Sequence, residues 1–77
     1  MIVAQFNWTA VKKSPNKHFQ GEYFYDMYEW NPYKMKWVFL PSARFGDLIY
    51  ADKCASARND EIQTMFDSNK YLPPAMK

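Results

Sequence analysis

The sequence has few of the residues on which small folded chains and enzymes often depend. Its 77 residues include one cysteine, Cys54, one histidine, His18, and two glycines, Gly21 and Gly46. A single cysteine cannot form an internal disulfide, and no cysteine–histidine cluster has the spacing of a metal site. Two separated glycines exclude a glycine-rich, phosphate-binding loop. We therefore expect a chain without cofactor or metal, in a reducing, cytoplasmic setting.

Long apolar runs are also missing. No segment approaches the roughly 18 apolar residues of a membrane-spanning helix, and the opening Met-Ile-Val-Ala-Gln does not resemble a signal peptide. We expect no membrane association and a single domain, 1–77. A core of this size rarely supplies more than about 3–5 kcal/mol. Because no disulfide or metal reinforces it, we expect reinforcement by a partner or by a second copy of the chain.

Candidate catalytic groups are isolated. A histidine base needs an orienting partner and a nucleophile within reach, and the sequence supplies no such set for His18. Cys54 is expected on the inner face of a helix, as a small core residue rather than a reactive thiol. Asp26 lies between aromatic residues and needs a lysine, a tyrosine hydroxyl or a β-bulge to accommodate it. We expect no enzyme.

The most informative stretch is 22–40, EYFYDMYEWNPYKMKWVFL, which predicts a β-hairpin. Aromatic and β-branched residues favour strands on both sides of Asn31-Pro32-Tyr33-Lys34, whose asparagine and proline favour a turn. A four-residue loop would place Trp30 opposite Met35 and Tyr28 opposite Trp37. Alternation then gives two faces, and neither is polar.

Further elements flank the hairpin. Alternating apolar residues predict a strand over 1–10, and the polar segment 11–21 indicates a connection. A strand over 45–50 is favoured, although the short apolar run within 43–51 also fits a helix. Asp52 would cap a helix over 53–67, and two prolines predict an extended tail over 71–77.

The order predicts an α+β fold, a small antiparallel meander of three to four strands with one C-terminal helix packed on one sheet face. We assign Trp37 to the covered face. The other face would then expose a patch for a protein partner or an identical chain, because tyrosine and methionine are enriched at interfaces. Its residues are Tyr23, Tyr25, Met27, Val38, Leu40 and Lys36. Alternatively, the loop 11–21 or the tail 71–77 covers this patch.

Charge suggests a second class of partner. The net charge is +2, and residues 1–20 contain lysines but no acidic residue. Lys12, Lys13 and Lys17 would contact phosphates while aromatic residues of the sheet stack on bases. The leading hypothesis is a non-enzymatic protein-binding module. The alternative is a nucleotide or single-stranded nucleic-acid binder.

The compact, aromatic-rich chain without catalytic groups resembles, in style, small bacteriophage proteins that inhibit host machinery or defence systems. The resemblance implies a protein inhibitor that acts in the host cytoplasm.

Overall fold

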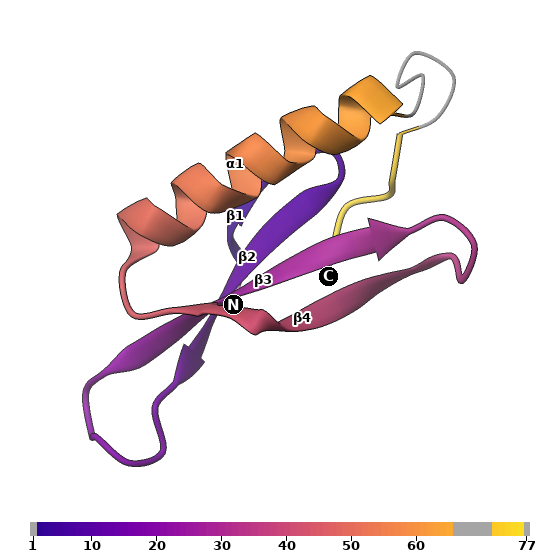
Figure 1. Ribbon diagram of the computed structural model, residues 1–77. Helices are drawn as coiled ribbons and strands as arrows, with labels where there is room; N and C mark the ends of the chain where they lie inside the picture. The colour runs from indigo at the N-terminus through magenta and orange to yellow at the C-terminus, as the bar shows by residue number, and fades with distance from the viewer. Residues whose placement is uncertain (1, 66–71, 77) are drawn as a thin grey trace.

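The fold is a four-stranded antiparallel sheet with one helix, as the computed structural model shows for residues 2–65 and 72–76 (Figure 1). The strands lie side by side in sequence order, so the sheet is a meander, and the predicted α+β class is confirmed. The elements are β1 (Ile2–Gln5), β2 (Thr9–Pro15), β3 (Tyr23–Asn31), β4 (Lys36–Phe45) and α1 (Leu48–Met65).

The single strand predicted over 1–10 is wrong, because the chain reverses direction within it. The Phe6 amide donates to the Thr9 carbonyl at 2.8 Å, which closes a tight turn between β1 and β2. The Trp8 amide, which points away from this turn, donates to Oδ1 of Asn59 at 2.7 Å. The connection predicted over 11–21 is therefore strand as far as Pro15.

The hairpin over 22–40 forms, but its register differs from the prediction. Trp30 pairs with Trp37, and Tyr28 pairs with Phe39, a shift of two residues that keeps each side chain on its predicted face. The Asn31 side chain accepts hydrogen bonds from the amides of Tyr33 (2.9 Å) and Lys34 (3.0 Å), and Met35 has a left-handed φ of 54°. Glu29 consequently lies opposite Val38 and not opposite Lys36.

The pairing of β3 with β4 is interrupted near the middle. Asp26 pairs with Arg44 and Tyr28 with Phe39, so that one residue of β3 lies opposite residues 40–43 of β4. Pro41, which has no amide hydrogen to donate to a ladder, lies within this bulge. β4 thus continues through Pro41 to Phe45, beyond the end of the hairpin predicted over 22–40.

Helix α1 begins five residues before the predicted 53–67 helix, so no strand forms over 45–50. Oδ1 of Asp47 accepts from the Ile49 amide at 3.1 Å, which makes Asp47 the N-cap. Asp52 lies inside the helix and is exposed. Leu48, Ile49 and Tyr50 form its first turn.

The helix packs on the sheet face that was predicted to be open. Val11, Met27, Ala51 and Ala55 form the buried core, and further residues pack against it, among them Tyr25, Leu40 and Phe45. The Thr9 hydroxyl donates to the Ala55 carbonyl at 2.7 Å, which brings the helix close to β2. Small residues on the inner helix face permit this approach. The predicted assignment of the two faces is therefore reversed around Met27, although Trp30 of the predicted covered face is buried in a cluster with Ile62 of α1.

A second cluster lies near the end of the helix. Trp8, Trp30 and Ile62 are buried, and Trp37 packs against them. Cys54, expected on the inner helix face, is half-buried. The spacing of apolar residues in the predicted helix 53–67 also places Met65 and Phe66 on that face, but Met65 is 72% exposed. Phe66, also expected there, lies outside the described residues.

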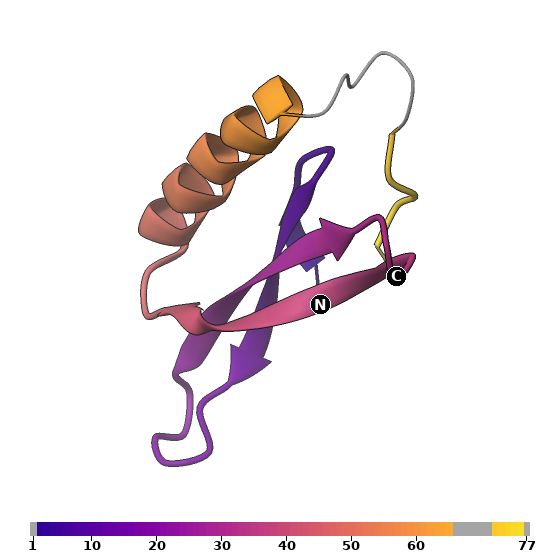
Figure 2. The ribbon, with the colours of Figure 1, turned by 45° about the vertical axis from the view of Figure 1, so that its right-hand side comes forward.

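The described part of the tail is neither helix nor strand, as predicted. The Trp37 indole donates to the Pro74 carbonyl at 3.3 Å, and the Met76 amide donates to Oε1 of Gln5 at 3.2 Å. Gln5 pairs with Ala10 on the sheet face away from α1. Residues 72–76 therefore lie against the end of that face nearest the β3–β4 turn (Figure 2).

Candidate functional site

The structure does not bring the six predicted partner-binding residues together as an open patch. Tyr25, Met27 and Leu40 pack in the core under α1, because alternation in β3 and β4 turns them toward the helix. Val38 is half-buried on the same side. Tyr23 and Lys36 are exposed, but each begins a different strand, at opposite ends of the hairpin. The prediction of an exposed face at these residues is wrong.

The face away from α1 carries aromatic rings with cations above them. We call it the open face and define it by Lys12, Phe24, Asp26, Tyr28, Phe39 and Arg44. The Lys12 ammonium lies 5.4 Å from the centre of the Tyr28 ring. The Arg44 guanidinium lies 4.7 Å from the centre of Phe24 and 5.8 Å from that of Phe39. Each pair is within the range of cation–π attraction.

Asp26 fixes the orientation of Arg44. Its carboxylate accepts from Nε of Arg44 at 2.7 Å, from Nη2 at 3.2 Å and from the Ser14 hydroxyl at 2.7 Å. Burial alone would raise the pKa of Asp26. The hydrogen bonds from Arg44 and Ser14 and the charge of Arg44 outweigh burial, so this pKa lies below its usual value. The guanidinium is therefore held in one geometry, close to the rings of Phe24 and Phe39.

A small pocket opens beside Arg44, at the end of the open face nearest the β2–β3 loop. We call it the loop pocket; it has a volume of about 340 Å³. Its lining residues are Ser14, Pro15, Asn16, Lys17, His18, Phe24 and Arg44. This loop extends beyond the start of α1, so the helix leaves it uncovered (Figures 1 and 2).

The predicted lysine cluster is divided between the two sides of the β2–β3 hairpin. Lys12 lies on the open face, and Lys17 lines the loop pocket. The Lys13 ammonium lies on the opposite side of β2, 3.9 Å from the centre of the Tyr23 ring. Two of the three lysines therefore reach the same side as Arg44.

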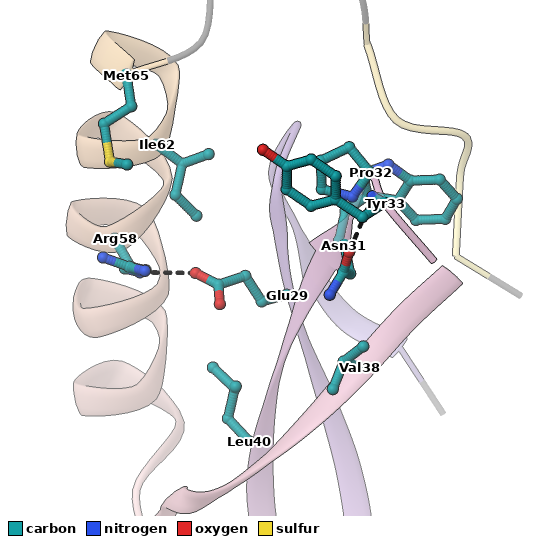
Figure 3. A pocket seen from close by; sticks show the side chains of 10 residues that line it. Glu29, Asn31, Pro32, Tyr33, Val38, Leu40, Arg58, Ile62 and Met65 are labelled. Carbon is teal, nitrogen blue, oxygen red and sulfur yellow. Dashed lines mark hydrogen bonds and ion pairs between the residues drawn. The ribbon is translucent and has the colours of Figure 1, made fainter. Parts of the chain in front are cut away.

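A separate apolar groove lies between α1 and the β3–β4 hairpin (Figure 3). We call it the helix–hairpin groove; its volume is about 220 Å³. Pro32, Tyr33, Val38, Leu40, Ile62 and Met65 provide apolar surface. The Arg58 guanidinium crosses it to bind Glu29 at 2.6 Å and also contacts Glu61 at 3.1 Å. Val38 and Leu40, from the predicted patch, line this groove.

Charge is unevenly divided between the sheet and the helix. Residues 2–45 contain six basic and three acidic residues, whereas residues 46–65 contain two basic and four acidic residues. Two of the acids in the sheet are paired, Asp26 with Arg44 and Glu29 with Arg58. The sheet layer is thus positive and the helix layer negative. An anionic partner would approach the sheet from the open face.

Two kinds of feature were sought in the described segments, clusters of metal-binding side chains and helices that could span a membrane. Within residues 2–65 and 72–76, no three histidine, cysteine or acidic side chains gather closely enough to hold a metal ion. No helix in these segments is sufficiently long and apolar to cross a bilayer. What the open face offers is stacking on aromatic rings and contact with positive charge.

Sequence reasoning missed Arg44, which is central to this face. It lies in segment 43–51, for which the hydrophobic periodicity did not distinguish strand from helix. One signal was present: Asp26 was placed among aromatic residues, where a carboxylate needs a partner. The partner is an arginine of the next strand rather than a lysine or a tyrosine hydroxyl.

Fold and site define the protein as a small α+β module with one covered sheet face and one that is aromatic and cationic. No protein-family model, curated protein or solved structure matches this chain.

Proposed function

We propose that the chain binds single-stranded nucleic acid on the open face. The observation that carries this proposal is the placement of Lys12 over Tyr28 and of Arg44 over Phe24 and Phe39. Single strands are bound by surfaces that combine aromatic rings for base stacking with positive charge for the backbone. The positive sheet layer and negative helix layer support the same orientation.

The protein-binding hypothesis loses its original basis, because α1 covers Tyr25, Met27 and Leu40. What remains open is smaller and more cationic. Phe39 is 36% exposed, and Phe24 and Tyr28 are half-buried beneath cationic groups. Bases stack on arginine planes as well as on rings, which suits a face where the partly exposed Arg44 side chain lies close to two rings.

The test is fluorescence anisotropy with a labelled oligo(dT) of about 15 nucleotides, near the upper site size of single-strand modules. We expect binding that weakens with salt. Three phosphate contacts, by Lys12, Lys17 and Arg44, give a slope of about −2 for log affinity against log salt. Phe39→Ala should lose about 1–3 kcal/mol if a base stacks there.

Two lysine variants provide a matched comparison. Lys12→Gln removes a charge from the open face and should reduce the salt slope by about 0.7. Lys53→Gln removes the same charge from the exposed side of α1 and should leave binding unchanged. The proposal fails if oligo(dT) does not bind, or if both variants weaken binding equally.

A protein partner is the second candidate, and the helix–hairpin groove favours it. The groove is apolar, and its rim includes Tyr33 at 88% exposure and Met65 at 72%. Exposed aromatic and methionine side chains around a groove are typical of peptide-binding surfaces. The resemblance to bacteriophage inhibitors fits this candidate, with a host protein in the cytoplasm as its target.

Light scattering tests the simplest form of this candidate, in which the partner is a second copy of the chain. Val38→Lys places a charge in the groove and should abolish any concentration-dependent dimer. If the purified chain is monomeric at all concentrations, self-association is excluded. A different protein would then have to occupy the groove.

A further inference from the structure

We propose that the loop pocket is a binding site for one nucleotide, with the base against Phe24 and Arg44 and the phosphate near Lys17 and His18. The inference rests on the proposed function, because it assigns one nucleotide of the bound strand to a defined position. A cavity of about 340 Å³ lies in the size range of small-ligand sites. It would also accept a free mononucleotide.

Asp26 fixes the position of Arg44 beside the pocket. Asp26 receives two of its hydrogen bonds, from Nε and Nη2, and an arginine has five N–H donors. The side chain remains 45% exposed, so other donors of the guanidinium face solvent. An arginine held in this way can stack on a base and donate to a phosphate without first being ordered.

The loop that closes the pocket is ordered by its own hydrogen bonds. Oδ1 of Asn16 accepts from the His18 amide at 2.9 Å, and the Asn16 amide donates to the Glu22 carbonyl at 3.0 Å. The Glu22 amide donates to the Phe19 carbonyl at 3.2 Å, and Gly21 has a φ of 85°. These bonds hold Lys17 and His18 on the side where they line the cavity.

The pocket combines an aromatic surface with positive charge in one small space. Phe24 provides an aromatic surface, and Lys17 and Arg44 provide two cations, whereas the nearby carboxylate of Asp26 already binds Arg44 and Ser14. A ligand that joins a planar ring to an anion satisfies both parts of the lining. A ring without charge, or an anion without a ring, satisfies only one part.

The experiment is a titration of the ¹⁵N-labelled chain, followed by NMR, with thymidine monophosphate, thymidine, inorganic phosphate and O-phosphotyrosine. We expect thymidine monophosphate to shift the amide signals of Ser14, Asn16, Lys17 and His18 and the Nε signal of Arg44. Thymidine and phosphate should each bind at least tenfold more weakly. If phosphate alone binds as tightly, the pocket is an anion site and the inference is overturned. If O-phosphotyrosine binds more tightly than the nucleotide, the site suits a peptide, and the inference is again overturned.

Variants separate this site from the rest of the open face. Lys17→Gln should weaken thymidine monophosphate binding three- to tenfold, and Phe24→Leu, which keeps an apolar side chain, should weaken it at least fivefold. Lys34→Gln, in the β3–β4 turn, is the matched control and should have no effect. If oligo(dT) binds but neither pocket variant affects the nucleotide, the inference fails while the proposed function stands. If the nucleotide binds and oligo(dT) does not, the proposed function fails while the pocket stands.

Discussion

At the scale of single residues, Asp26 connects stability to the candidate site. It is 4% exposed, lies in the middle strand pair and binds Arg44 and Ser14. Removing the carboxylate would leave Arg44 without its anchor above Phe24. The same interaction therefore contributes to the free energy of unfolding and to the geometry of the open face.

We predict that Asp26→Asn lowers the free energy of unfolding by about 1.5–3 kcal/mol, the range for hydrogen bonds to charged groups. The wild type should also lose stability in acid. Since the pKa of Asp26 is lower in the folded than in the unfolded chain, its contribution is complete above the unfolded value near 3.9. The contribution then declines as pH falls through the folded pKa.

Urea unfolding of both proteins between pH 7 and pH 2 measures this effect. The difference between wild type and Asp26→Asn should be constant at neutral pH and shrink below about pH 4, where Asp26 of the unfolded wild-type chain binds a proton before Asp26 of the folded chain does. A difference that grows in acid would contradict the assigned sign.

Sequence pattern identified Asp26 as unusual but did not find its partner. The regular register predicted Asp26 opposite Phe39. The bulge at residues 40–43 brings Arg44 there instead. A bulge depends on how the whole sheet packs and twists, and local composition gives no means of placing it.

At the scale of elements, the start of α1 shows how two similar local signals are resolved. Asp47 and Asp52 are both good N-cap residues, and the sequence predicted Asp52. The helix begins after Asp47, since this brings Ala51 and Ala55, both 0% exposed, onto the sheet. Local propensity favours Asp47 and Asp52 almost equally as N-cap residues, and the burial of the helix against the sheet selects Asp47.

We predict that Asp47→Ala lowers the free energy of unfolding by about 1 kcal/mol, the usual contribution of an N-cap. Asp52→Ala removes an identical side chain from the first turns of the helix. It should lower the free energy of unfolding by no more than a few tenths of the loss expected for Asp47→Ala. Thermal melts followed by circular dichroism compare the two. Equal effects would show that Asp47 does not act as the cap.

The fold class could be predicted because hairpin composition and helix periodicity are local properties. The choice of face could not, because both sides of β3 carry apolar residues. Tyr25 and Met27 alternate with Tyr28 and Trp30, and alternation shows only that they are separate groups. Which group the helix covers depends on the turn at residues 46–47, where the chain leaves β4.

At the scale of the whole molecule, one sheet face forms the core under α1 and the other is the open face. A pair of substitutions tests this division. We predict that Met27→Ala lowers the free energy of unfolding by about 2–5 kcal/mol, as for buried methionine, and so nearly unfolds a domain of this size. Phe39→Ala on the open face should cost only about 1 kcal/mol, the contribution of an aromatic pair such as Tyr28–Phe39.

Chemical denaturation with both variants provides the measurement. Similar losses for Met27→Ala and Phe39→Ala would mean that the open face also contributes to the core. A larger loss for Phe39→Ala would restore the original assignment of the faces.

The bulge in β4 has a further consequence for the protein in concentrated solution. β1 and β4 are the two outer strands of the sheet, and an outer strand offers unpaired backbone groups on which foreign strands can add and start aggregation. β1 is only four residues long, and Pro41 interrupts the ten-residue β4. An incoming strand therefore meets no long, regular edge. The same irregularity that brings Arg44 to Asp26 protects the sheet from growing into a fibre.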